Sequence, residues 1–182
     1  MKKKIMKKKI MKKDNITLIG MPGSGKSTIS KLLAKKLNFD FIDTDEYIAK
    51  QEKMSPQQIV DTKGDKGFLK IEKKRILELL PLKKYIISPG GCVVYLTRVM
   101  SAIKGLSLIV FLDLPLDVLE KRLINQETRG MIWLESKSLK ELYIKRSPLY
   151  KKYADITINC FQKSDKQIVQ EIIKKLTPLK RN

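Results

Sequence analysis

Residues 16–28 read ITLIGMPGSGKST and decide the fold of the chain. The apolar run Ile16–Ile19 leads directly into Gly20–Ser27, which fits the pattern G-x-x-x-x-G-K-[ST] of a phosphate-binding loop. A helical pattern follows at once, with apolar residues at Ile29, Leu32, Leu33 and Leu37. In such a loop the glycines let backbone N–H groups turn around phosphates, and the helix N-terminus adds the positive end of its dipole. The context predicts a P-loop rather than a chance glycine-rich turn.

The rest of the chain alternates short β-type runs with longer helical patterns, which predicts βαβ units and a parallel sheet. The expected strands are 16–19, 39–43, 85–88, 108–112 and 155–159. The expected helices are 26–37, 44–51, 56–62, 66–80, 116–125, 138–151 and 165–176. Ser55–Gln58 marks one helix start with an N-cap serine, a proline at the first helical position and a capping-box glutamine. We expect a single α/β domain over residues 14–182.

Composition limits the classes of function. The chain of 182 residues holds 39 Lys+Arg against 19 Asp+Glu, a formal charge of +20, and eight of the lysines fall in residues 1–13. That stretch is expected to be a disordered basic tail. No apolar run approaches the roughly 20 residues that span a membrane. The absence of histidine excludes Ser-His-Asp hydrolysis and histidine-ligated metals. Cys92 and Cys160 are too few for a disulfide scaffold, which favours the reducing cytoplasm.

Several side chains around the P-loop are candidates for phosphate chemistry. Lys26 is expected to reach the β and γ phosphates of a nucleotide, and the Ser27 hydroxyl to hold Mg²⁺. Asp43 and Asp45 follow the second expected strand, and a period of two predicts that both side chains lie on one side at its carboxyl end, where ligands of such sheets bind. Asp43 is then expected to hold a magnesium-bound water and Asp45 to accept a hydrogen bond from a substrate hydroxyl. Alternatively, either carboxylate caps the helix that begins near Thr44.

Together with the P-loop, four further motifs make the sequence similar to the shikimate kinase family of P-loop proteins, from about Ile16 to Ile173. They are Asp43-Thr44-Asp45, Gly90-Gly91, Arg129 in an expected lid, and Arg146-Ser147-Pro148-Leu149-Tyr150. The resemblance implies a three-layer fold with a five-stranded parallel sheet of order 2-3-1-4-5, helices on both faces and a mobile lid. It also implies a cytoplasmic monomer that transfers the γ-phosphoryl group of ATP, with Mg²⁺, to the 3-hydroxyl of shikimate in aromatic amino-acid biosynthesis.

The resemblance further implies roles for individual residues. Those expected to bind ATP are Gly23, Ser24, Gly25, Lys26, Ser27, Thr28 and Arg129. Those expected to bind the substrate are Asp45, Gly90, Gly91 and Arg146, and the metal ligands are Ser27 and Asp43. Lys26, Asp45 and Arg129 are the expected catalytic residues. Arg129 would stabilise charge on the moving phosphoryl group, and Arg146 would hold the substrate carboxylate in a bidentate pair.

The sequence departs from the family pattern in the expected substrate pocket. The family has F-R-x-x-E where this chain has Phe68–Glu72, so that Leu69 replaces a second arginine for the substrate carboxylate. Losing that charge-assisted hydrogen bond would weaken binding by roughly tenfold to a hundredfold. The third glycine of the family's G-G-G is Cys92, which is expected to be a small buried residue.

Two alternatives to a shikimate kinase remain. The departures at Leu69 and Cys92 favour a P-loop kinase of another hydroxylated metabolite or of a nucleotide. The positive charge and the lysine-rich tail favour a nucleotide-dependent protein that associates with nucleic acid, although the sequence carries no RNA-binding signature or aromatic stacking motif. The expected partners are therefore a small hydroxy acid and ATP, with neither a membrane nor a nucleic acid among them.

Overall fold

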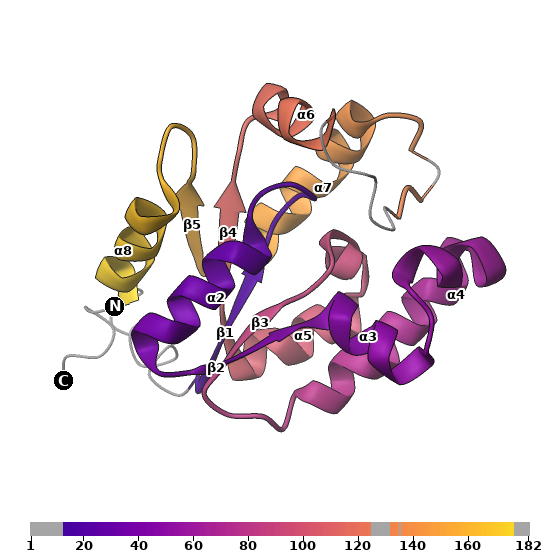
Figure 1. Ribbon diagram of the computed structural model, residues 1–182, viewed down its shortest axis with the longest axis horizontal. Helices are drawn as coiled ribbons and strands as arrows, with labels where there is room; N and C mark the ends of the chain where they lie inside the picture. The colour runs from indigo at the N-terminus through magenta and orange to yellow at the C-terminus, as the bar shows by residue number, and fades with distance from the viewer. Residues whose placement is uncertain (1–12, 125–131, 135, 177–182) are drawn as a thin grey trace.

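A five-stranded parallel sheet lies at the centre of the molecule (Figure 1). The computed structural model describes residues 13–124, 132–134 and 136–176. The strands are β1 (Asn15–Ile19), β2 (Asp40–Asp43), β3 (Tyr85–Ser88), β4 (Ser107–Asp113) and β5 (Ile156–Asn159), in the order β2-β3-β1-β4-β5. The predicted strand order is confirmed, and each strand begins and ends within a residue or so of its predicted position.

Helices cover both faces of the sheet, as predicted. They are α2 (Lys26–Leu37), α3 (Thr44–Glu52), α4 (Pro56–Leu79), the 3₁₀ helix η1 (Gly91–Tyr95), α5 (Thr97–Leu106), α6 (Leu116–Ile124), α7 (Leu139–Tyr153) and α8 (Asp165–Leu176). Helices α2 and α8 pack together on one face, and α5 and α7 contact β4 from the other. Helix α3 and the start of α4 extend past the edge strand β2 (Figure 1). Among the described residues, no helix is long and apolar enough to cross a membrane.

The helices differ from the prediction in three places. The expected helices 56–62 and 66–80 are joined in α4, although Gly64, at φ 66° and ψ 174°, interrupts the helical backbone between them. The 3₁₀ helix η1 and helix α5 were not predicted, because neither has an N-cap residue with a side-chain capping bond. The predicted start of α4 is confirmed, since Ser55 and Gln58 form the reciprocal bonds of a capping box.

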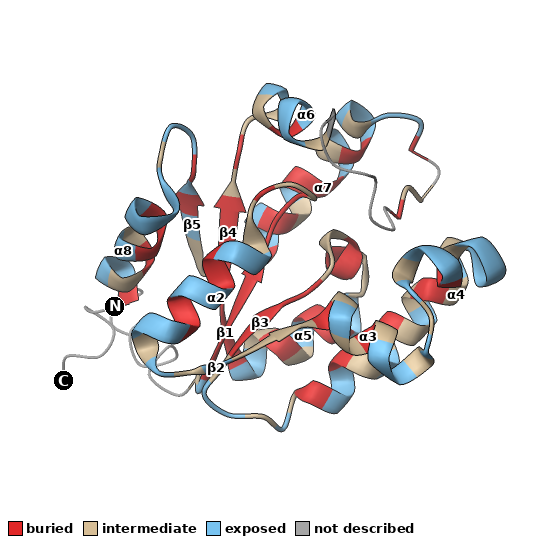
Figure 2. Ribbon diagram, in the orientation of Figure 1, coloured by how far each residue is buried: buried red, intermediate tan, exposed pale blue. Residues whose placement is uncertain are grey.

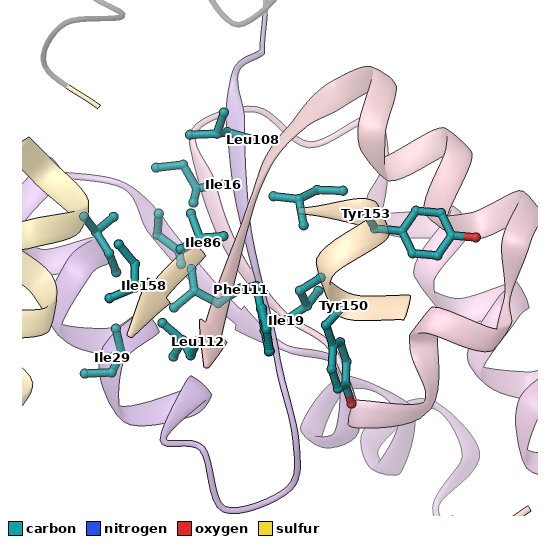
Figure 3. Close-up of a cluster of buried hydrophobic side chains, with 14 of the residues drawn as sticks. Ile16, Ile19, Ile29, Ile86, Leu108, Phe111, Leu112, Tyr150, Tyr153 and Ile158 are labelled. Atoms are coloured by element: carbon teal, nitrogen blue, oxygen red, sulfur yellow. The ribbon is translucent and has the colours of Figure 1, made fainter. Parts of the chain in front are cut away.

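The inner strands are buried by the helices on both faces and form the main core, whereas the edge strands β2 and β5 are largely half-buried or exposed (Figure 2). All five residues of β1 are buried, and β4 is buried from Ser107 to Leu112. Figure 3 shows the apolar side chains of these strands facing those of the flanking helices. Phe111 of β4 stacks on Tyr150 of α7 with 5.2 Å between the ring centroids. This contact fixes α7 against the sheet near the carboxyl ends of the strands.

A second apolar cluster lies between α3, α4, η1 and the segment just before α7. Its buried members are Ile48, Ile59, Phe68, Cys92 and Ile132, and Leu69 and Tyr95 are among the partly buried residues packed on them. The cluster joins elements that are far apart in the sequence. It therefore sets the position of the side chains beyond the carboxyl edge of the sheet.

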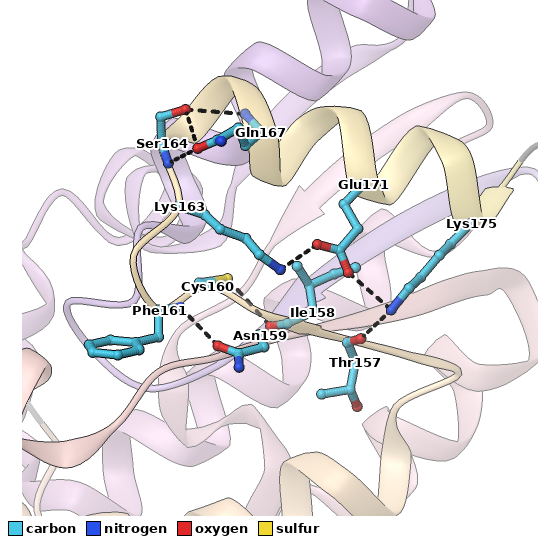
Figure 4. A network of polar contacts seen from close by, with 10 residues as sticks. All are labelled: Thr157, Ile158, Asn159, Cys160, Phe161, Lys163, Ser164, Gln167, Glu171 and Lys175. Carbon is cyan, nitrogen blue, oxygen red and sulfur yellow. Dashed lines mark hydrogen bonds and ion pairs between the residues drawn. The ribbon is translucent and has the colours of Figure 1, made fainter.

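Polar contacts secure the last strand and helix (Figure 4). Lys163 Nζ donates to Glu171 Oε2 at 2.6 Å, and Lys175 Nζ lies 3.3 Å from Glu171 Oε1. At the start of α8, Ser164 and Gln167 exchange backbone and side-chain bonds in the manner of a capping box. Lys175 Nζ also donates to the carbonyl of Thr157 in β5 at 2.9 Å, which joins α8 to the strand before it.

The first described residue, Lys13, is anchored to the sheet. Its side chain is 4% exposed, and its Nζ donates to Asp155 Oδ2 at 2.8 Å. The same carboxylate oxygen accepts a hydrogen bond from the backbone N–H of Ile109 in β4. The remainder of the predicted basic tail, residues 1–12, lies outside the described residues, so its disorder stays a prediction.

Candidate active site

The P-loop joins β1 to α2 as the sequence predicts. Gly23 and Gly25 have φ values of 77° and 88°, in the left-handed region that favours glycine. Helix α2 begins at Lys26, whose Nζ donates to the carbonyls of Gly20 and Met21 at 3.0 Å each. Burial lowers the pKa of Lys26 to about 8, although the nearby Asp45 and Asp43 carboxylates oppose the shift. The ammonium group therefore bonds to the backbone of its own loop, at the N-terminus of the helix.

Asp43 connects the P-loop helix to the end of β2. The Ser27 hydroxyl donates to Asp43 Oδ2 at 2.6 Å, and Asp43 Oδ1 accepts from the backbone N–H of Asp45 at 3.0 Å. Asp43 is thus the N-cap of α3 and also a neighbour of Ser27. The expectation that both carboxylates share one side of a strand is wrong, because β2 ends at Asp43 and Asp45 lies in the first turn of α3. The turn of the helix, and not the period of a strand, sets their relative direction.

Asp45 faces a narrow space beside Gly90. Its Oδ1 is buried and has no hydrogen-bond partner among the described residues. Burial, and then the charge of Asp43, raise the pKa of Asp45 to about 6, while Lys26 lowers it. A Cβ atom on Gly90 would lie 3.0 Å from Asp45 Oδ1 and 3.0 Å from Glu72 Oε1. The missing side chain at Gly90 therefore keeps open the space between two carboxyl groups.

Glu72 was not among the predicted site residues, yet it lies at the centre of this region. It is fully buried in α4, its Oε1 has no partner in the described part of the chain, and the Cys92 thiol donates to its Oε2 at 3.1 Å. Burial raises the pKa of Glu72 to about 8, so the carboxyl group is mostly neutral at pH 7. Burial also raises the pKa of the Cys92 thiol, which confirms the expectation of a small buried residue instead of a reactive one.

Arg146 of α7 is a buried cation. Its side chain is 1% exposed and donates to the backbone carbonyl of Ile132. Gly91 lies against it, since a Cβ on that glycine would come within 3.1 Å of Arg146 Nη1. Burial disfavours the charge, but the surrounding side chains, Tyr150 first, raise the pKa of Arg146 above its ordinary value. Within the described ranges Arg146 forms no ion pair with a carboxylate, which is unusual because buried charges are normally paired.

The remaining predicted residues surround the same loop, with one exception. Ser24 is buried and Thr28 is exposed in the first turn of α2. Arg129 lies outside the described residues, as does most of the expected lid. A cation that the sequence analysis missed, Arg122 of α6, donates to the carbonyl of Gly23 at 3.2 Å. Its position in the helix just before the expected lid is the only signal that the sequence offers for it.

The arrangement brings a phosphate-binding loop, two carboxyl groups and a buried arginine to one edge of the sheet. The sequence pattern of one family, shikimate kinase, matches residues 22–177, which include most of the P-loop and all of these side chains. The chain belongs to the shikimate kinase family. It is accordingly an ATP-dependent phosphotransferase that acts on an alcohol group.

Individual relatives agree with this assignment. The chain is 38% identical to the shikimate kinase of Persephonella marina, over 87% of this chain and 96% of the relative. It is 35% identical to that of a Sulfurihydrogenibium species, over 89% and 97% of the two chains. Its fold is similar to shikimate kinase from Acinetobacter baumannii in complex with shikimate, with a TM-score of 0.86, 25% identity and coverage of 97% and 99%. The shikimate kinase of Aquifex aeolicus gives a TM-score of 0.78 at 32% identity, over 90% and 96% of the chains.

Proposed function

We propose that the protein transfers the γ-phosphoryl group of ATP to the 3-hydroxyl of shikimate. The observation that carries the proposal is the buried Arg146, which forms no ion pair among the described residues and lies with Asp45 around Gly90 and Gly91, beside the P-loop. The charged groups influence one another's pKa: Lys26 acts on Asp45, Asp45 and Arg146 act on Glu72, and Arg146 acts on Lys26. A phosphate site, a carboxylate acceptor and a cation thus lie close together. A small acid with a hydroxyl group fits this set of partners.

ATP would bind through the backbone amides of Gly23–Thr28 and the N-terminus of α2. Lys26 now donates to carbonyls of its own loop, and phosphate oxygens would replace those weaker neutral acceptors. Arg129 remains the residue predicted to stabilise charge on the transferred group from the lid. Lys26, Asp45 and Arg129 are then the catalytic residues of the proposal.

The oxygens of Ser27 and Asp43 fit a magnesium ion. Mg²⁺ prefers oxygen ligands and keeps several waters, so it commonly takes only one or two ligands from the protein. A hydroxyl and a carboxylate 2.6 Å apart suit this chemistry, and no cluster of three acidic, cysteine or histidine residues occurs among the described residues to suggest another metal site. When bound, the ion would neutralise charge on the β and γ phosphates.

Asp45 would orient the attacking hydroxyl and accept its proton. With a pKa of about 6 it is mostly ionised at pH 7.5, and its free Oδ1 offers a lone pair to that hydroxyl. The carboxylate of the substrate would pair with Arg146, while Gly90 and Gly91 would allow the ring to approach the backbone. Catalysis would then consist mainly of positioning and of stabilising charge.

One observation favours a second candidate, a kinase of another hydroxylated metabolite. Leu69 packs in the apolar cluster beside the site, where the family pattern has an arginine for the substrate carboxylate. A substrate without a carboxylate, or with a less charged group in its place, would suit this change. The proposed enzyme is otherwise expected to be a cytoplasmic monomer, in keeping with two free, buried cysteines.

A coupled assay of ADP release tests the proposal. Turnover with Mg·ATP is expected to depend on shikimate and to fall at least a hundredfold in Lys26→Met, because the ammonium group stabilises the phosphates in the transition state. Lys31→Met is the matched control, since Lys31 is an exposed lysine on the same helix. ATP hydrolysis that ignores shikimate would refute the proposed substrate, and a panel of hydroxy acids and nucleosides would then identify the alternative.

A further inference from the structure

The replacement of the family's arginine by Leu69 leaves the proposed carboxylate site short of one donor. Two polar atoms near this site are buried and have no hydrogen-bond partner within the part of the chain that the structure describes. They are Arg146 Nε and the hydroxyl oxygen of Tyr95. Arg146 is 1% exposed and Tyr95 is half-buried, but each of the two atoms is itself buried and out of contact with bulk water. Unpaired donors of this kind are unfavourable unless a ligand completes them.

The two side chains lie against each other. The guanidinium carbon of Arg146 is 5.3 Å from the centroid of the Tyr95 ring. Tyr95 is also among the groups that raise the pKa of Arg146, through a side-chain contact in which its oxygen faces the guanidinium as an acceptor. The ring belongs to the apolar cluster that contains Leu69, Cys92 and Ile132. The hydroxyl of Tyr95 is therefore next to the cation and in the same cluster as the position that lost its arginine.

Packing alone does not explain the hydroxyl. A phenylalanine at position 95 would supply the same ring to the cluster and to the guanidinium, whereas the oxygen of Tyr95 faces that guanidinium and its proton has no acceptor among the described residues. A tyrosine hydroxyl donates well to a carboxylate and, unlike arginine, adds no second charge to a region where Arg146 already lacks an ion-pair partner among the described residues. A ligand carboxylate would satisfy both free donors at once.

We propose that Tyr95 is a substrate-binding residue whose hydroxyl donates to the carboxylate held by Arg146, in place of the arginine that Leu69 replaces. The inference rests on the proposed function, since it assumes a substrate with a carboxylate. It explains how the site tolerates Leu69. It also makes the recognition of the carboxylate depend on one charged and one neutral donor, carried by α7 and η1.

The test is the steady-state kinetics of Tyr95→Phe, which removes only the hydroxyl. The KM for shikimate is expected to rise roughly tenfold to a hundredfold, the range for losing a hydrogen bond to a charged group. The kcat at saturation and the KM for ATP are expected to stay within twofold, because the hydroxyl contacts neither the phosphates nor Asp45. Tyr47→Phe is the matched control, since that tyrosine bonds to Glu78 on the surface of α3 and α4.

Two further measurements separate a ligand contact from a structural role. With the methyl ester of shikimate, which lacks the carboxylate charge, the original chain and Tyr95→Phe are expected to have the same KM. Adding Leu69→Arg to Tyr95→Phe is expected to restore the KM for shikimate, because it returns the missing donor. An unchanged KM in Tyr95→Phe, or an equal loss with acid and ester, overturns the inference but leaves the proposed function standing. Absence of shikimate turnover in the original chain refutes the proposed function, and the inference with it.

Discussion

Glu72→Gln should change how the stability of the protein depends on pH. Burial raises the pKa of Glu72 from 4.5 to about 8, so the folded state keeps a proton that the unfolded chain releases. A raised pKa contributes stability that is fully present below pH 4.5 and is lost as the pH rises through about 8. Glutamine has nearly the same shape and no proton to lose. The variant should therefore lack this part of the pH dependence.

The size of this change in stability follows from the release of one proton. Between pH 5.5 and 7.5 the unfolded glutamate is ionised and the folded one is not, so the free energy of unfolding falls by about 1.4 kcal/mol per pH unit. Over the two units the original chain should lose roughly 2–3 kcal/mol relative to Glu72→Gln. For a protein of this size the difference corresponds to roughly 5–10 °C in Tm. Asp45 also titrates in this window in both proteins, and because its charge helps to raise the pKa of Glu72, the difference between the proteins includes the coupling of the two groups.

Urea unfolding at pH 5.5, 6.5 and 7.5 measures this difference directly. Glu78→Gln is the control on the same helix, because Arg75 lowers the pKa of this exposed carboxylate and it stays ionised throughout the range. The control should leave the pH slope unchanged. If the stabilities of the original chain and of Glu72→Gln follow parallel lines against pH, then Glu72 is ionised in the folded protein, and the reasoning from its burial is wrong.

Two further predictions concern the site itself. The kcat/KM for shikimate should fall below pH 6, because Asp45 has a pKa of about 6 and gains a proton there. It should also fall above pH 8, because Lys26 has a pKa of about 8 and loses its proton. A pH profile of kcat/KM that is flat from 5 to 9 would contradict these roles. Gly90→Ala should lower kcat/KM at least tenfold, since the new methyl group would lie 3.0 Å from oxygens of Asp45 and Glu72. Gly105→Ala should leave kcat/KM unchanged, because no atom lies within 4 Å of the new methyl group. Equal kcat/KM values in the two variants would show that the substrate does not need the open space at Gly90.

The fold could be predicted closely because its local signals agree with one another. The P-loop pattern and the capping box at Ser55 are each formed by a few neighbouring residues, and each strand or helix has its own short hydrophobic pattern. Helix α5 escaped prediction because it has no capping side chain, although its buried Val99, Met100 and Ile103 follow a helical spacing. The break near Gly64 was expected as a gap between two helices and occurs as a kink within one.

The candidate site was predictable only where a local motif marks it. Lys26, Ser27 and Asp43 belong to such motifs and lie together as expected. The burial of Glu72 and its bond to Cys92 depend on the packing of α4 against η1, twenty residues apart, which no local pattern encodes. The proximity of Tyr95 to Arg146 likewise arises only when α7 returns to the sheet.

The order of the strands has a consequence for how the protein is made. The P-loop strand β1 is central, and its partners β3 and β4 come about seventy and about ninety residues later in the chain. At typical rates of synthesis the ribosome needs roughly 5–20 s to produce that intervening sequence. Until β3 is made, β1 has no neighbouring strand to pair with, and its second partner is present only once β4 follows. The strand that leads into the P-loop is therefore fully paired only after more than half of the chain has been synthesised.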